Sequence, residues 1–415
     1  MFKSFFPSPK WFFTSLLLWS AVGIAVWYSV GDQLGLALGF GPFEEDPAPV
    51  IGLGHFTTPE FMWFYAFVGF FFVIFAGAWM SLSRHPWQRW SVLGTCYILF
   101  FTYYSVQVSV AINNWYRPFY DLLQAALGGE AVTIGQFVDY IVIFMQIAMM
   151  YVILMVINAF VVAHYIFRWR TSMTEYYSEL WPKVRHIEGA SQRIQEDTMR
   201  FAAILKGLGT NIVDSVMTLI AFLPVLWGLS QYVTELPIVG DIPAPLVVAA
   251  IFWAAFGTGI LALAGIKLPG LEFQNQRVEA AYRKELVYGE DNDERADPVS
   301  LRELFGNVRK SYFRIYKHYT YFNMVRYSYL QADNIFALVL LLPSIVAGKL
   351  TLGIYSQISS AFGQVSNSFQ FLVNSWTTII DLISVYKRLA SFEAAMNDQP
   401  LVDEDQKFEA GVIRD

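Results

Sequence analysis

The sequence predicts an all-α protein that crosses a membrane eight times. Its 415 residues are 55% hydrophobic and only 15% charged, whereas an ordinary soluble domain is about 25% charged. Aromatic residues make up 17% of the chain, and Trp and Tyr are typical of membrane–water interfaces. This composition excludes a disordered chain, a disulfide-linked scaffold and a soluble enzyme.

Apolar runs as long as a membrane-spanning helix follow one another along the chain. The first, Trp11–Val30, has no charged residue. It is longer than the apolar part of a signal peptide, the competing interpretation, so we expect it to remain as a helix. A seventh run, 318–347, contains two charged residues, and the eighth, 353–386, is unusually polar. The five between the first and the seventh are 61–82, 90–112, 138–167, 209–230 and 245–266.

The distribution of positive charge predicts the orientation of these helices. With the N-terminus placed in the cytoplasm, 25 of the 28 Lys and Arg residues lie in cytoplasmic segments and two in external loops. Cytoplasmic loops of membrane proteins carry such an excess. Both termini are therefore predicted to be cytoplasmic.

The eighth run carries a polar stripe on one face. Positions alternately three and four residues apart share one side of a helix, and seven of eight such positions are polar. Because polar side chains are costly in hydrocarbon, we expect the stripe to line an aqueous cavity. A helix lying on the membrane surface is the alternative, although such helices are usually rich in Lys and Arg. The predicted cavity-lining residues are Gln357, Ser360, Gln364, Asn367, Asn374, Thr378 and Asp381.

Arg326 and Asp333 lie within the seventh run, seven residues apart on one helical face. A charge at that depth is a candidate functional group by default. An ion pair that ties two helices together is the structural alternative.

Two long cytoplasmic segments, 168–206 and 267–297, are predicted to continue helices beyond the membrane. Carboxylates on them that converge in a poorly hydrated cavity would raise one another's pKa toward neutrality and could carry protons. The alternative is that Glu196 with Arg200, and Glu279 with Arg283, are pairs four residues apart that stabilise exposed helices.

Motifs of enzymes and of cofactor sites are absent from the sequence. There is no phosphate-binding glycine loop, zinc-protease motif or nucleophile–base pair, and the five histidines lack metal-ligand spacing. The single cysteine, Cys96, excludes an intrachain disulfide, and the net charge of -6 offers no surface for nucleic acid. We therefore expect no enzyme activity, cofactor, metal or nucleotide.

From Trp90 onward, six helices separated in pairs by two cytoplasmic segments resemble the membrane half of ABC exporters. Matching stretches include 167–170, 192–197 and 361–365. In those exporters a nucleotide-binding domain follows, whereas here about 23 residues with an acidic character follow Phe392. The expected domains are a two-helix extension (1–89), a six-helix domain (90–393) and an acidic cytoplasmic tail (394–415).

Such a membrane domain without an ATPase resembles the SbmA/BacA family of bacterial inner-membrane peptide transporters, and most closely its BacA branch. The resemblance runs along the whole chain. Its most specific stretches are Met1–Pro7, Asn114–Tyr116 with Pro118–Asp121, and Gly265–Glu290.

The resemblance implies a homodimer that takes up antimicrobial, proline-rich, nodule-type, microcin or bleomycin-like peptides by alternating access, driven by the proton gradient and not by ATP. Protons, peptides and surrounding membrane lipids are its partners. A ladder of glutamates implied to carry the protons would be Glu188, Glu196, Glu272, Glu279 and Glu285. Alternatives are a membrane subunit that recruits a separate ATPase, and a component of very-long-chain fatty acid modification of lipid A.

Five further residues lie where cytoplasmic helices leave the membrane, and are predicted to latch an inward gate. Capping or helix pairing is the alternative role for each of them. They are Trp181, Gln192, Asp197, Arg283 and Arg388.

Overall fold

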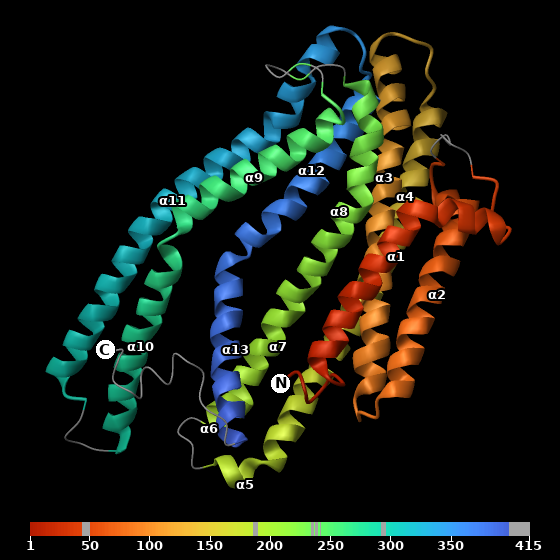
Figure 1. The fold of residues 1–415 in the computed structure, drawn as a ribbon. Coiled ribbons are helices and arrows are strands. Elements are labelled where there is room, and N and C mark those ends of the chain that lie inside the picture. The colour runs from red at the N-terminus through yellow and green to blue at the C-terminus, as the bar shows by residue number, and fades with distance from the viewer. Residues whose placement is uncertain are drawn as a thin grey trace. The chain divides into compact units, whose positions relative to one another are not determined.

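The computed structural model shows a helical chain (Figure 1) and describes residues 1–43, 50–185, 190–233, 236, 240, 242–291 and 296–397. Within these residues it has no strand, only an isolated bridge between Leu236 and Gly240. Its α-helices are α1 (Pro9–Ala37), α2 (Pro59–Leu82), α3 (Gly94–Leu127), α4 (Ile134–Glu179), α5 (Trp181–Val184), α6 (Ala190–Gln192), α7 (Thr198–Ile204), α8 (Thr210–Leu229), α9 (Pro245–Gly265), α10 (Leu268–Asp291), α11 (Pro298–Val346), α12 (Leu352–Asn374) and α13 (Trp376–Met396).

Shorter turns join several of these helices. Leu53–Thr57 and Ser230–Tyr232 are 3₁₀ turns. Three π-helical turns, Arg89–Leu93, Arg193–Asp197 and Leu205–Gly209, lead into α3, α7 and α8. Such turns often occur at functional sites.

Seven helical segments of the described chain are long and apolar enough to cross a membrane, which makes it a multi-pass membrane protein. They correspond to the first seven predicted runs. The eighth run is also helical, but its polar composition keeps it out of that set, so the count of eight stays a prediction. The prediction of a single helix for this run is wrong, because Ser375 separates α12 from α13.

The chain forms two compact units. Unit 1 comprises residues 1–225, 350–364 and 381–415, and unit 2 comprises 226–349 and 365–380. Helices α1–α7 and most of α8 therefore belong to unit 1, whereas α9, α10 and α11 belong to unit 2. The domain boundaries expected at residues 89 and 393 stay predictions.

Aromatic residues of the N-terminal segment help to form the core of unit 1. Phe5 and Phe6 are 0% and 2% exposed. Their rings lie 5.7 and 4.9 Å from that of Trp169 on α4, and Trp169 also contacts Phe201 on α7. The Phe-rich start of the chain is thus a packing element that joins α4 and α7.

Helices α3 and α12 are in close contact within unit 1. Asp121 Oδ1 accepts a hydrogen bond from the backbone N–H of Gly353 at 3.0 Å, and Gln124 Oε1 accepts one from Leu352 at 2.6 Å. These bonds satisfy N–H groups that the first turn of a helix leaves unpaired. A side chain on Gly353 would collide with the carbonyl of Arg117 and with Asp121.

Replacing Gly353 by alanine is expected to destabilise the protein by about 3 kcal/mol, the upper end for overpacking, because backbone cannot move aside as a flexible side chain can. The thermal midpoint of the purified protein in detergent measures the effect. Gly363, on the same helix, has open space where the methyl group of an alanine would lie, with no atom within 4 Å. Gly363→Ala should therefore raise stability by about 0.5–1 kcal/mol. Equal midpoints for the two variants would contradict the close contact.

In unit 2, α11 packs against both α9 and α10. It is 49 residues long, so it extends about 73 Å, well beyond a hydrocarbon layer of about 30 Å. Asp297 begins it by accepting hydrogen bonds from the backbone N–H groups of Val299 and Ser300. Hydrogen bonds from Ser300 hold the pKa of the Asp297 carboxyl below its usual range.

Candidate functional site

Asp333 lies in the C-terminal half of α11, a helix long and apolar enough to cross a membrane. The helix ends 13 residues later, at Val346, which places Asp333 about 20 Å from that end. The hydrocarbon layer of a bilayer is about 30 Å thick. This spacing is compatible with a position inside the hydrocarbon layer, and the depth of Asp333 in the membrane stays a prediction.

Neutral side chains from two other helices hold this carboxylate. Trp253 Nε1 on α9 donates a hydrogen bond to Asp333 Oδ1 at 2.6 Å, and Ser366 Oγ on α12 donates to the same oxygen at 3.2 Å. Among the residues that the structure describes, no cation forms an ion pair with Asp333. The carboxylate thus depends on neutral donors.

The same donors belong to a wider buried network. Gln370 Nε2 donates to Ser366 Oγ at 2.9 Å and to Tyr329 Oη at 2.8 Å, and Tyr329 Oη donates to the carbonyl of Trp253 at 3.3 Å. Ser366, Gln370 and Tyr329 are 1–4% exposed. We call these five residues, Asp333, Trp253, Ser366, Gln370 and Tyr329, the Asp333 cluster.

Packing fixes the Trp253 ring in this cluster. The ring stacks on Phe336 with centroids 3.9 Å apart and an interplanar angle of 11°, and it also stacks on Tyr329. Gly257, one turn further along α9, leaves room for the Tyr329 ring, because any side chain there would collide with it. The orientation of the donors to Asp333 therefore depends on this glycine.

Gly257→Ala is expected to displace Tyr329, disturb the donors to Asp333 and lower stability by about 1–3 kcal/mol. Gly259→Ala is the matched control, because its methyl group would meet nothing within 4 Å. Thermal unfolding and transport assays on both variants measure the difference. Equal thermal midpoints and equal transport in the two variants would contradict the role of Gly257 in holding the Asp333 cluster.

Arg326, the other predicted intramembrane charge, lies two turns before Asp333 on α11. Its Nε is buried, and no hydrogen-bond partner for that atom is found in the described part of the chain. Because seven residues correspond to about 10 Å along a helix, the two side chains occupy different levels of α11.

Apart from Gln357, the residues of the predicted polar stripe on α12 and α13 are exposed or half-buried, unlike the packed side of α12. Ile358, Phe362 and Val365 on that packed side are 0–2% exposed. Of the stripe residues, Asn367, Asn374 and Thr378 are exposed, Ser360, Gln364 and Asp381 are half-buried, and Gln357 is buried. A role in lining a cavity stays a prediction.

Gln357, the buried member of the stripe, joins α12 to α3. Its Nε2 donates to Asn114 Oδ1 at 3.2 Å, and its carbonyl accepts from Asn113 Nδ2 at 2.9 Å. Helix pairing therefore explains this polar residue without a cavity.

A second polar cluster lies in unit 1, between the π-helical turn Arg193–Asp197 and α13. Asp197 is 3% exposed, and Arg388 donates to both of its carboxylate oxygens, from Nη2 at 2.9 Å and from Nε at 3.1 Å. Arg388 Nη1 also donates to Ser384, and Arg193 donates to the Arg388 carbonyl. Two of the predicted gate residues thus form one ion pair.

Other predicted gate residues lie elsewhere. Gln192 is exposed and donates to Glu196 at 3.1 Å. Trp181 on α5 is 38% exposed, and Arg283 is exposed on α10. The alternative interpretation paired Arg200 with Glu196. In the structure, Arg200 instead donates a hydrogen bond to Asp381 at 3.0 Å.

The predicted glutamates are divided between the units. Glu188 lies outside the described residues, and Glu196 belongs to unit 1. Glu272, Glu279 and Glu285 lie on α10 in unit 2, where Glu272 accepts from Tyr319 Oη and Glu285 from the backbone of Ala296, both at 3.1 Å. A shared role in carrying protons stays a prediction. Across the described chain, no group of His, Cys, Asp and Glu could hold a metal ion.

The four other residues of the Asp333 cluster were not predicted from the sequence. Tyr329 precedes Asp333 by four residues, and Ser366 precedes Gln370 by four, so each pair shares one helical face. That spacing was a usable signal on each helix. Trp253 gave no comparable signal, because it lies 80 residues from Asp333 in the chain.

Residues 84–397 match the sequence profile of the SbmA/BacA-like family. Among curated proteins, the chain is 23% identical to an uncharacterized ABC transporter ATP-binding protein of Synechocystis, over 92% of the chain's own length. It is 26% identical to an uncharacterized ABC transporter ATP-binding protein of Haemophilus influenzae, over 52% of its own length. It is 24% identical to the chloroplastic ABC transporter D family member 2 of Arabidopsis thaliana, over 56% of its own length. It covers 57%, 36% and 33% of these relatives.

Proposed function

Because the chain belongs to the SbmA/BacA-like family, a family of membrane transporters, we propose that it imports peptides from the periplasm into the cytoplasm and is driven by the proton gradient. The transporter is a homodimer in the bacterial inner membrane, with both termini cytoplasmic. The location of 25 of 28 Lys and Arg residues supports this orientation. Alternating access of one cavity to the two sides moves the peptide.

The observation that carries this proposal is the environment of Asp333. An ionised carboxylate in hydrocarbon is costly, and its donors in the described chain, Trp253 and Ser366, are neutral. Protonation of such a group leaves no buried cation unpaired, whereas protonation of an ion-paired carboxylate would. Asp333 is therefore the group that we propose to couple peptide movement to the proton gradient.

The stripe on α12 and α13 provides the surface along which the peptide moves. The amide and hydroxyl groups of its exposed members, Asn367, Asn374 and Thr378, can bind water, and water can bridge mismatched polar groups at little cost. A hydrated wall of this kind suits peptides of varied sequence. The proposal therefore includes broad specificity rather than a tight pocket.

Purified protein in liposomes, with no ATP and no other protein, tests this function. A fluorescent proline-rich peptide outside the vesicles should accumulate when the outside is made acidic, and an uncoupler should abolish accumulation. Protein-free liposomes measure leakage. If correctly oriented, folded protein shows no gradient-dependent accumulation, proton-driven import is wrong.

A membrane subunit that works with a separate ATPase is the second candidate. The names of two relatives, which include the words ATP-binding protein, favour it. In that case the chain should copurify with an ATPase from its native membranes. Accumulation in the same liposomes should then require that ATPase and ATP rather than a proton gradient.

A further inference from the structure

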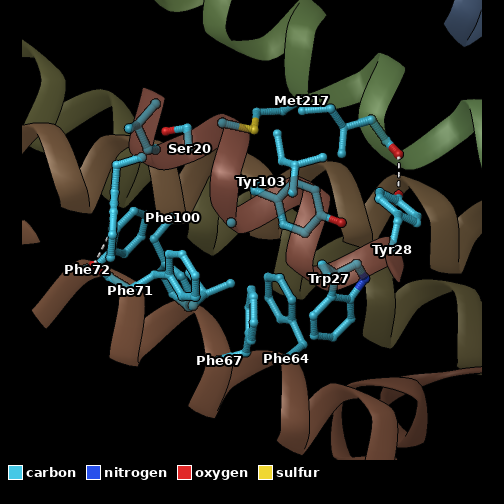
Figure 2. Close-up of a pocket in the computed structure, with 16 residues that line it drawn as sticks. Ser20, Trp27, Tyr28, Phe64, Phe67, Phe71, Phe72, Phe100, Tyr103 and Met217 are labelled. Atoms are coloured by element: carbon cyan, nitrogen blue, oxygen red, sulfur yellow. Dashed lines mark hydrogen bonds between the residues drawn. The ribbon is translucent and has the colours of Figure 1, made fainter. Parts of the chain in front are cut away.

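An apolar cavity of about 140 Å³ lies in unit 1 between α1, α2, α3 and α8 (Figure 2). Aromatic side chains provide much of its wall, among them Trp27, Phe64, Phe67, Phe100 and Tyr103. Neither the Asp333 cluster nor the polar stripe contributes to it. The cavity and the proposed transport site therefore have no lining residue in common.

Polar groups at the edge of the cavity are engaged with backbone carbonyls. Trp19 Nε1 donates to the carbonyl of Phe71 at 2.9 Å, and Tyr28 Oη donates to that of Ile220 at 3.1 Å. None of the described residues that line the cavity is charged. Its chemistry thus favours an apolar ligand over one that needs hydrogen bonds.

Helix geometry places this cavity near the middle of the bilayer. Trp19 follows the start of α1 by 10 residues and Phe67 follows the start of α2 by eight, which correspond to about 15 and 12 Å. Because α1 and α2 are consecutive spans that run in opposite directions, these distances are measured from opposite membrane surfaces. Both fall near the midplane of a hydrocarbon layer of about 30 Å.

We propose that this cavity binds the terminal part of an acyl chain of a membrane phospholipid. The ends of such chains lie at the bilayer midplane. A dry apolar cavity of about 150 Å³ binds benzene, so the space here fits about six carbon atoms. Ile24 and Tyr28 at the rim are 39% and 56% exposed. An acyl chain that lies against α1 can therefore enter the cavity between them and its wall.

Photocrosslinking in vesicles tests this site on the full-length protein. The probe is a phosphatidylethanolamine with a diazirine at the end of one acyl chain, and peptide mass spectrometry locates the crosslinks. We expect crosslinks to cavity residues on α1, α2, α3 and α8 above those to the exposed Leu17 and Phe70. A diazirine next to the ester of the same lipid should give few of them.

Ser20→Trp, which fills the cavity, should remove most of these crosslinks. Leu17→Trp, on the exposed side of the same helix, should leave them unchanged. If Ser20→Trp does not fold, the distribution of crosslinks in the unaltered protein still tests the proposal. Crosslinks spread evenly over exposed apolar residues, or equal for the two diazirine positions, would overturn the proposal.

Discussion

Asp333→Asn is expected to reduce proton-driven peptide accumulation to background while the protein still folds. Asparagine has nearly the same shape and can accept the hydrogen bonds from Trp253 and Ser366. It cannot release a proton, so the coupling between peptide and proton is lost. Accumulation in liposomes under an acidic outside measures the effect.

Two controls separate coupling from damage to the fold. Exchange of labelled for unlabelled peptide across the membrane, which needs no net proton movement, should persist in Asp333→Asn. Asn334→Ser, at the next and exposed position, should accumulate peptide as the unaltered protein does. If Asp333→Asn accumulates peptide normally, Asp333 is not the coupling group and the α10 glutamates become the next candidates.

Arg388→Gln is expected to cost about 3 kcal/mol of stability, because it leaves the buried Asp197 carboxylate without its charged partner. Asp197 is 3% exposed and receives hydrogen bonds on both oxygens from Arg388. The loss should appear as a lower thermal midpoint. The ion pair that joins α13 to the turn before α7 is then missing.

Arg200→Gln is the matched control for this pair. The side chains of Arg200 and Asp381 are 42% and 34% exposed, and such exposed pairs are worth less than about 1 kcal/mol. Asp197→Asn combined with Arg388→Gln should regain part of the lost stability, since neither residue is then charged. A double variant as unstable as Arg388→Gln alone would mean that packing, and not the unpaired charge, dominates.

The sequence predicted the long apolar helices well because hydropathy and length decide them locally. Residues 138–167 and 245–266, for example, fall within α4 and in the segment from α9 into α10. The break at Ser375 could not be foreseen, since neither a proline nor a glycine occurs there. Local signals thus sufficed for the spans but not for the division of the last one.

Contacts between segments far apart in the chain could not be predicted from the sequence. Asp197 and Arg388 were both singled out, but not as a pair, because 191 residues separate them. Asp333 was identified from its cost in hydrocarbon, whereas its donor Trp253 was not, since a tryptophan in a membrane helix is ordinary. Which polar residues meet depends on helix packing, and one chain's periodicity carries no information on that.

The most direct test of proton coupling is the pH inside the vesicles during peptide uptake. Liposomes containing the protein and a trapped pH-sensitive dye are held at zero membrane potential and equal pH, and peptide is added outside. Coupling through Asp333 predicts that the lumen becomes acidic as peptide enters, and that Asp333→Asn shows no such change. Peptide uptake without acidification, or equal acidification in both proteins, would contradict it.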